Sequence, residues 1–255
     1  MVLQIVTIPC LSDNYAYLAH DPATGATAAV DVPEAAPILA ALRAQGWTLS
    51  DVLLTHHHAD HVQGLSALLS EAPARVIGAA ADAHRLPPLD RAVIEGDRVQ
   101  IGSETGRVID VSGHTVGHIA FHFPESGAVF TADSLMTMGC GRVFEGSMAQ
   151  MHASLAKLAA LPPDTLVCSG HEYTAANARF AVTIDPDNAR LAARVREIEV
   201  ARAANRPTVP SRLDEELATN PFLRSHDPEI RARLGMQGAS DAEVFAEIRS
   251  RKDRF

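Results

Sequence analysis

A chain of 255 residues is long enough to bury a full hydrophobic core, either as one large domain or as a domain with an appendage. Hydrophobic residues make up 47% of the chain and charged residues 21%, which are ordinary values for a globular protein. The formal net charge of −9 argues against non-specific binding to nucleic acid.

The sequence predicts a cytoplasmic protein. The N-terminus has no basic segment before its apolar residues, and Pro9 and Asp13 soon interrupt it, so we expect no signal peptide. No apolar run approaches the length of a membrane span. The cysteines, Cys10, Cys140 and Cys168, are odd in number and widely spaced. This pattern argues against a disulfide framework and indicates a reducing compartment.

Charge is distributed unevenly along the chain. Residues 1–172 hold 8 Lys and Arg against 18 Asp and Glu, a balance of −10. Residues 173–255 hold 14 against 13, a balance of +1. Because composition often shifts at a domain boundary, we predict two domains, residues 1–172 and residues 173–255.

The first part of the chain is predicted to be rich in β-strands. Apolar, β-prone runs occur at 3–8, 15–19, 28–30, 52–54, 75–77, 99–101, 108–111, 119–123, 128–130 and 166–168. Helical patterns occur between them at 34–44, 62–69 and 147–161. Strands with few intervening helices favour two sheets packed face to face, with helices on the outside.

The second part is predicted to be helical, with helices at about 173–182, 187–205 and 241–252 and shorter pieces broken by prolines. Two helices begin with the sequence pattern of a capping box. Ser147 precedes Gln150 by three residues, and Ser240 precedes Glu243 by three.

The most informative stretch is the histidine-rich sequence from Thr55 to His61. It follows the apolar run 52–54 and precedes a helical pattern. In an extended loop His56 and His58 point the same way, so they can bind one ion, while Asp60 and His61 are left for a second. Imidazole suits zinc and iron, and carboxylate adds manganese. An affinity tag would lie at a terminus, so we interpret the stretch as a metal site.

Three further candidate ligands also follow buried β runs. His114 comes after the run 108–111, Asp133 after 128–130, and His171 after 166–168. A single histidine beside a glycine is more often a turn residue. Together with His56, His58, Asp60 and His61, however, these residues supply five histidines and two aspartates, enough for two ions that share a bridging carboxylate.

These motifs resemble those of the metallo-β-lactamase superfamily. The matching segments are Thr55-His56-x-His58-x-Asp60-His61, Gly113-His114-Thr115, Asp133 and Gly170-His171. More narrowly, the chain resembles the glyoxalase II (hydroxyacylglutathione hydrolase) family. The supporting stretches are Asp13-Asn14-Tyr15, Gly139-Cys140-Gly141-Arg142, His171-Glu172-Tyr173-Thr174, Asn220-Pro221-Phe222 and Arg249-x-x-Lys252-Asp253. The resemblance implies an α+β fold: an αββα sandwich over residues 1–172 and an all-helical, glutathione-binding domain over 173–255.

The resemblance also implies the ligand set of a binuclear centre. One divalent ion would be held by His56, His58 and His114, and the second by Asp60, His61 and His171. Asp133 would bridge the two ions, which makes Asp60 and Asp133 catalytic through the metals. Zinc is the expected metal, with iron and manganese as alternatives.

The activity implied is hydrolysis of the thioester in S-(2-hydroxyacyl)glutathione. With S-D-lactoylglutathione, a hydroxide that bridges the metals would release glutathione and D-lactate, a step of methylglyoxal detoxification. The alternatives are a mono-iron glutathione persulfide dioxygenase of the same superfamily and a non-enzymatic module. We expect a monomer with a small-molecule substrate and no nucleic-acid or membrane partner.

The residues expected to contact glutathione, also by resemblance, are Arg142, Phe144, Tyr173, Arg249 and Lys252. The common animal form has a lysine at the position of Arg142 and a tyrosine at that of Phe144. Arginine keeps the charge and adds a bidentate fork, whereas Phe144 loses a hydroxyl group and one hydrogen bond. Arg249 and Lys252 lie three apart on the last predicted helix and share a face.

Overall fold

A computed structural model describes residues 2–255, which form two compact units. The first unit comprises the residues up to Val111 together with Val116–Ala132. The second comprises Ser112–Thr115 and Asp133–Phe255. Strands dominate the first unit and helices the second, which confirms the predicted α+β class with a helical C-terminal region. The domain boundary at residue 172 stays a prediction.

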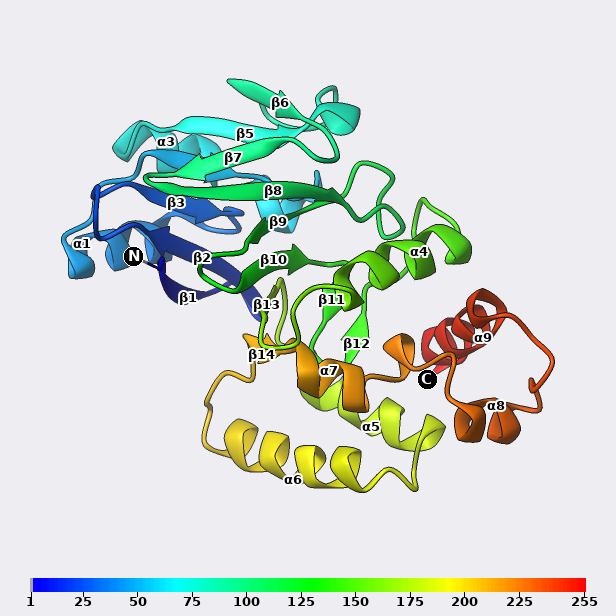
Figure 1. The fold of residues 1–255 in the computed structure, drawn as a ribbon. Coiled ribbons are helices and arrows are strands. Elements are labelled where there is room, and N and C mark those ends of the chain that lie inside the picture. Colours follow the sequence, from blue (N-terminus) through cyan, green and yellow to red (C-terminus); the bar gives the residue numbers. More distant parts are fainter. Residues whose placement is uncertain (1) are drawn as a thin grey trace. The chain divides into compact units, whose positions relative to one another are not determined.

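The first unit contains a mixed sheet of six strands covered by two helices. Its strands follow chain order: β1 (Gln4–Cys10), β2 (Asn14–His20), β3 (Thr27–Val30), β4 (Asp51–Leu53), β5 (Arg75–Ala79) and β6 (Arg91–Val93). The first three pair antiparallel and the rest parallel. Helices α1 (Ala35–Gln45) and α3 (Leu65–Glu71) cover one face, where Ile38 and Leu68 pack into an apolar core (Figure 1).

A second, antiparallel set of strands packs against this sheet within the same unit. It consists of β7 (Arg98–Ile101), β8 (Glu104–Asp110), β9 (Ile119–Phe123) and β10 (Ala128–Ala132). Phe121, Phe123 and Phe130 are almost fully buried. The ring of Tyr17, on β2, lies 5.5 Å from that of Phe130 in an edge-on arrangement. Aromatic side chains therefore fill the space between the two layers, as expected for packed sheets.

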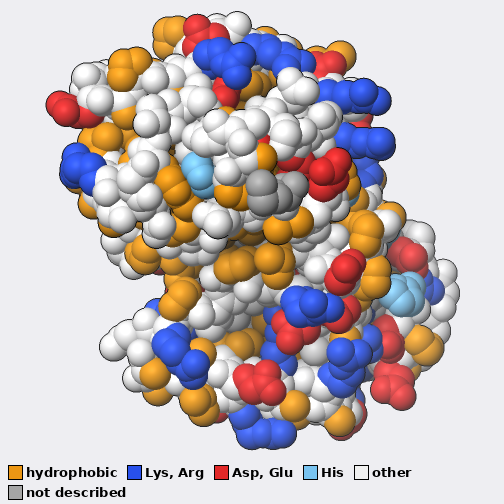
Figure 2. Space-filling view, turned by 60° about the vertical axis from the view of Figure 1, so that its left-hand side comes forward, with side chains coloured by type: hydrophobic (Ala, Val, Ile, Leu, Met, Phe, Trp, Pro, Cys, Tyr) orange, Lys and Arg blue, Asp and Glu red, His pale blue; other side chains and the backbone are white. Residues whose placement is uncertain are grey.

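The second unit is mainly helical. Its helices are α4 (Met148–Ala159), α5 (Thr174–Ile184), α6 (Ala189–Ala203), α7 (Leu213–Thr219), α8 (Pro228–Leu234) and α9 (Asp241–Arg254). Both predicted capping boxes are present, at Ser147 and Ser240. Phe180, Phe222 and Phe245 form an aromatic core. Figure 2 shows acidic and basic side chains side by side over these helices, in keeping with their nearly balanced charge.

Several short elements escaped the sequence analysis. Besides β6, these include the hairpin strands β11 (Leu135–Met136) and β12 (Gly139–Cys140). Strand β14 (Ser211–Arg212) lies inside the region predicted to be helical and pairs with β13 (Leu166–Ser169). Two- or three-residue strands carry no periodicity to detect. Among the helices described in residues 2–255, none combines the length and apolar character needed to cross a membrane.

The predicted helix at 62–69 is split in two at Gly64. The short helix α2 (Ala59–Val62) ends two residues earlier, and α3 begins at Leu65 with Gly64 as its N-cap. The Gly64 N–H donates to the carbonyl of Val32, at 2.9 Å. A Cβ atom at Gly64 would lie 2.9 Å from the backbone of Glu34 and Ala35. Because glycine lets these backbones approach, the chain can turn directly after the histidine-rich loop.

We expect Gly64→Ala to destabilise the protein by about 1–3 kcal/mol, since the new methyl group would push backbone against backbone. Urea denaturation followed by circular dichroism measures this change. The matched control is Gly238→Ala, because a Cβ at Gly238 meets nothing within 4 Å. Equal unfolding midpoints for the two variants would contradict the proposed close approach.

Candidate metal centre

The histidine-rich loop lies between β4 and α2, as its sequence context predicted. It is tied to the first unit by its backbone: the Ile119 N–H donates to the carbonyl of Thr55, at 3.0 Å. His56 and His61 are fully buried, and His58 is half-buried. The ring of His118 stacks on that of His56, with centroids 4.5 Å apart. The loop is therefore held in one conformation by packing.

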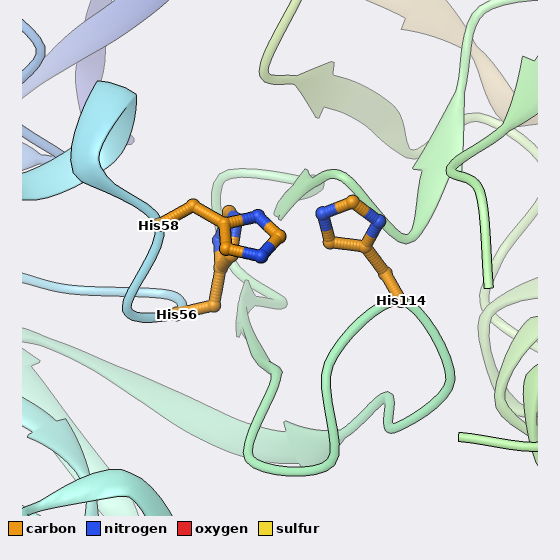
Figure 3. A group of neighbouring side chains, drawn as sticks. All are labelled: His56, His58 and His114. Atoms are coloured by element: carbon orange, nitrogen blue, oxygen red, sulfur yellow. The ribbon is translucent and has the colours of Figure 1, made fainter. Parts of the chain in front are cut away.

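His56 and His58 point toward each other with their ring nitrogens. Nε2 of His56 lies 3.2 Å from Nδ1 of His58. Two ligands of one tetrahedral zinc ion, with bonds of about 2.0–2.1 Å, lie roughly 3.4 Å apart. The spacing therefore fits two nitrogens that share an ion. Figure 3 draws these two side chains together with that of His114. His114 belongs to the segment Ser112–Thr115, which is part of the second unit.

Asp31 orients His61, and the sequence analysis missed it. One carboxylate oxygen of Asp31 accepts a hydrogen bond from the Thr55 N–H at 2.9 Å. The other accepts from the Thr55 hydroxyl and from Nδ1 of His61, each at 2.8 Å. This fixes the tautomer of His61 and leaves Nε2 as the lone-pair donor. Asp31 directly follows β3, so the rule that located the other ligands, a polar residue just past a buried strand, also applies to it.

Asp60 is held by Asn14. The Asn14 amide donates to both the backbone carbonyl and the carboxylate of Asp60, at 3.1 Å in each case. The Asp60 carboxylate lies 3.8 Å from Nε2 of His61, and 42% of its side chain is exposed. Asp60 and His61 thus offer neighbouring donor atoms from the first turn of α2. Asn14 belongs to the Asp13-Asn14-Tyr15 stretch that supported the family resemblance.

The second unit brings together His114, Asp133 and His171. Nε2 of His114 lies 3.4 Å, and Nε2 of His171 lies 3.3 Å, from the same oxygen, Oδ2 of Asp133. All three side chains are buried. Both distances again match the spacing of two ligands on one ion. One carboxylate oxygen therefore stands at ligand distance from two imidazoles, an arrangement suited to a bridging carboxylate.

Backbone and aromatic contacts orient these two histidines. Nδ1 of His114 donates to the carbonyl of Arg142 at 2.7 Å, which leaves Nε2 as its lone-pair donor. The ring of Phe144 meets that of His114 edge-on at 5.3 Å. The ring of Tyr173 stacks on His171 at 4.6 Å. Phe144 is 61% exposed and Tyr173 40%, so both offer an aromatic face to a ligand.

Other conspicuous residues have structural contacts. Nδ1 of His57 lies 3.1 Å from a carboxylate oxygen of Asp82, and its side chain is 17% exposed. Nδ1 of His118 donates to the Ile119 carbonyl at 3.1 Å. Burial raises the pKa of the Cys140 thiol to about 11, so this thiol is protonated near neutral pH. These contacts show how His57 and His118 are held, and the raised pKa of Cys140 argues against a thiolate nucleophile at this position.

The predicted glutathione contacts near the C-terminus differ in exposure. Arg249 is buried, and its guanidinium donates to the carbonyl of Cys140 at 2.9 Å and to Asp253 at 2.9 Å. Asp253 also accepts from Nε of Arg142, at 3.2 Å. The ammonium of Lys252 donates to the carbonyl of Ala176 at 3.2 Å. Burial, with Arg249 and Arg179 nearby, lowers the pKa of Lys252 to about 8.

Comparisons with known proteins agree with this fold and these donors. Residues 21–171 match the family model described as "Metallo-beta-lactamase superfamily", and residues 172–255 match "Hydroxyacylglutathione hydrolase C-terminus". The fold is similar to the crystal structure of the BLEG-1 B3 metallo-β-lactamase, with a TM-score of 0.67 and 20% identity over 86% of this chain and 99% of that one. It is also similar to a di-iron-bound form of TTHA1623, with a TM-score of 0.63 and 25% identity over 86% and 100%.

The fold and the first family match define a protein of the metallo-β-lactamase superfamily. A hydroxyacylglutathione hydrolase of Jannaschia sp. (strain CCS1) is 68% identical over 252 residues, which are 99% of this chain and 98% of that protein. The chain belongs to the hydroxyacylglutathione hydrolase family.

We expect Asp31→Asn to weaken metal binding by about 10- to 100-fold, because a neutral amide is a poorer acceptor for the His61 N–H and the two Thr55 donors. Competition with a chromophoric chelator measures the affinity. The control is Asp82→Asn, since Asp82 is equally buried and bonded to a histidine, His57, that is not a predicted ligand. Similar affinities in the two variants would show that Asp31 has no special role.

Proposed function

We propose that the protein hydrolyses S-(2-hydroxyacyl)glutathione thioesters, with S-D-lactoylglutathione as the substrate and glutathione and D-lactate as the products. The observation that carries the proposal is the pair of oriented donor sets in a chain that belongs to the hydroxyacylglutathione hydrolase family throughout its length. The persulfide dioxygenase alternative is not favoured, because residues 172–255 match the C-terminal region of hydroxyacylglutathione hydrolases.

The donor sets would hold two divalent ions. The first ion would be held by His56, His58 and His114, and the second by Asp60, His61 and His171. Asp133 would be a ligand of both. The residues fit such a centre in two respects. Ligand-type atoms within each unit stand at the separation expected around one ion. His61 and His114 each have their second ring nitrogen fixed by an acceptor, as metal-bound histidines do. Zinc is the expected metal, with iron and manganese as alternatives.

When bound, the two ions would supply a nucleophile by lowering the pKa of a water molecule, and would polarise the thioester carbonyl. The protein's own residues then have two tasks, to orient the donors and to hold the glutathione part. The leaving group is a thiol of cysteine type, with a pKa of about 8.5, so it departs as a thiolate without a protein acid. His57 is the one histidine of the loop that is not assigned to metal. Its Nδ1 is bonded to Asp82, which supports a mechanism in which His57 does not act as an acid.

Glutathione would be bound by Arg142, Phe144, Tyr173, Arg249 and Lys252, with residues 173–255 as the glutathione-binding domain. Phe144 and Tyr173 offer exposed rings against His114 and His171. Arg142 offers a half-exposed guanidinium suited to a carboxylate. Arg249 is buried, so we propose that it acts through Asp253, the carboxylate it shares with Arg142. We also propose that the protein works as a monomer in the cytoplasm.

The direct test is hydrolysis of S-D-lactoylglutathione, followed by the loss of thioester absorbance, in wild type and Asp133→Ala. We expect turnover in the wild type and a loss of at least about 100-fold in the variant, with fewer than two ions retained per chain, because Asp133 is assigned to both. Asp214→Ala, which removes an exposed carboxylate paired with Arg212, is the control. Two tightly held ions and normal turnover in Asp133→Ala would refute the assignment.

Lys252 gives a prediction about pH. Because its pKa is about 8, its charge is present below that pH and is lost as the pH rises through it. We therefore expect the KM for the glutathione thioester to rise between pH 7 and pH 9, with a smaller change in kcat.

The matched variants are Lys252→Arg, which keeps its charge to higher pH, and Lys252→Ala. The arginine variant should have a KM that is flat with pH, whereas the alanine variant should have a KM raised roughly ten-fold at pH 7. If wild type and Lys252→Arg show the same pH dependence, Lys252 does not bind the substrate.

A further inference from the structure

The hairpin β11–β12 connects the proposed metal ligand Asp133 to Arg142, whose carbonyl orients a second proposed ligand, His114. Asp133 lies two residues before the hairpin, and the carbonyl that orients His114 belongs to Arg142, two residues after it. The two ends of the segment are joined, since the Gly141 N–H donates to the Ser134 carbonyl at 3.1 Å. A Cβ at Gly141 would lie 2.0 Å from the carbonyl oxygen of Asp133. Any shift of the hairpin therefore moves both Asp133 and the acceptor of His114.

Two side chains at the end of α7 hold the turn of this hairpin. The carboxylate of Glu216 accepts from the Met138 N–H at 2.8 Å. The Asn220 amide donates to the carbonyls of Met136, at 3.2 Å, and Gly139, at 2.9 Å. It also lies 3.1 Å from the Glu216 carboxylate. Met138 has a φ of +61°, a left-handed conformation that is costly for a non-glycine residue and persists only when its surroundings impose it.

Arg194, on α6, compensates the buried charge of Glu216. The carboxylate of Glu216 is fully buried, and the Arg194 guanidinium, nearly as buried, donates to it and to the Thr219 hydroxyl. Buried ion pairs contribute little net stability, because the cost of desolvation offsets the attraction between the charges. Their best-attested use is to specify one arrangement of the elements around them. Here the arrangement that is specified is the hairpin turn.

We propose that Glu216 and Asn220 are positioning residues for the metal centre. They set the hairpin, and through it the Asp133 carboxylate and the Arg142 carbonyl that orients His114. This inference rests on the metal ligands assigned under the proposed function. It also gives a role to the Asn220-Pro221-Phe222 stretch, and it makes the C-terminal helices part of the metal centre as well as a place to bind glutathione.

The test compares Asn220→Ala and Glu216→Gln with Asn188→Ala. Asn188 caps α6 and donates to the carbonyl of Ala218 at 2.9 Å, so its loss removes similar bonds in the same helical region without touching the hairpin. Zn²⁺ affinity is measured by chelator competition, and folding by thermal denaturation. We expect about 10- to 100-fold weaker Zn²⁺ binding in Asn220→Ala and Glu216→Gln at temperatures where they are folded, and less than about three-fold in Asn188→Ala.

Hydrogen exchange of the metal-free protein provides a readout that needs neither metal nor activity. Peptides covering residues 133–142 should exchange at least about ten-fold faster in Asn220→Ala than in Asn188→Ala or wild type. If Glu216→Gln does not fold because Arg194 loses its buried carboxylate partner, Asn220→Ala carries the test. Lower thermal stability with unchanged Zn²⁺ affinity and unchanged exchange would overturn the inference. If the wild type binds no Zn²⁺ but Asn220→Ala still exchanges faster over residues 133–142, the proposed function is overturned and not this inference.

Discussion

The constraint on which the rest of the structure depends is the orientation of imidazole rings. A histidine offers a lone pair at one nitrogen only, and which nitrogen this is depends on the partner of the other. In this chain the Asp31 carboxylate fixes His61 and the Arg142 carbonyl fixes His114. The proposed ligand set is thus only as well placed as the backbone segments that carry these two acceptors.

Those segments are shaped by unusual backbone positions. Asp31 has a φ of +57°, and Ala132, just before Asp133, has a φ of +41°. Such conformations cost about 1–3 kcal/mol each for non-glycine residues and tend to occur where function requires them. Gly64 allows the tight turn after the histidine-rich loop, and Glu216 with Asn220 holds the hairpin that follows Asp133. Residues outside the proposed ligand set therefore help to determine the geometry of the donors.

Much of this could be predicted from the sequence, because each candidate ligand directly follows an apolar run that forms a strand. That rule located the histidine-rich loop, His114, Asp133 and His171, and it would have found Asp31. The hairpin β11–β12 could not be predicted, since two-residue strands have no periodicity. Nor could the burial of Arg249: a cation near a helix end is ordinarily exposed, and its contacts with Cys140 and Asp253 depend on tertiary structure.

The most direct test of a two-metal thioesterase is titration of the metal-free protein with Zn²⁺, following the hydrolysis of S-D-lactoylglutathione and the consumption of oxygen together. The account predicts that the rate rises until two equivalents of Zn²⁺ per chain are bound and then stays constant, with no oxygen consumed. Saturation at one equivalent would contradict the shared role of Asp133. Oxygen uptake dependent on iron, without thioester hydrolysis, would contradict the proposed reaction.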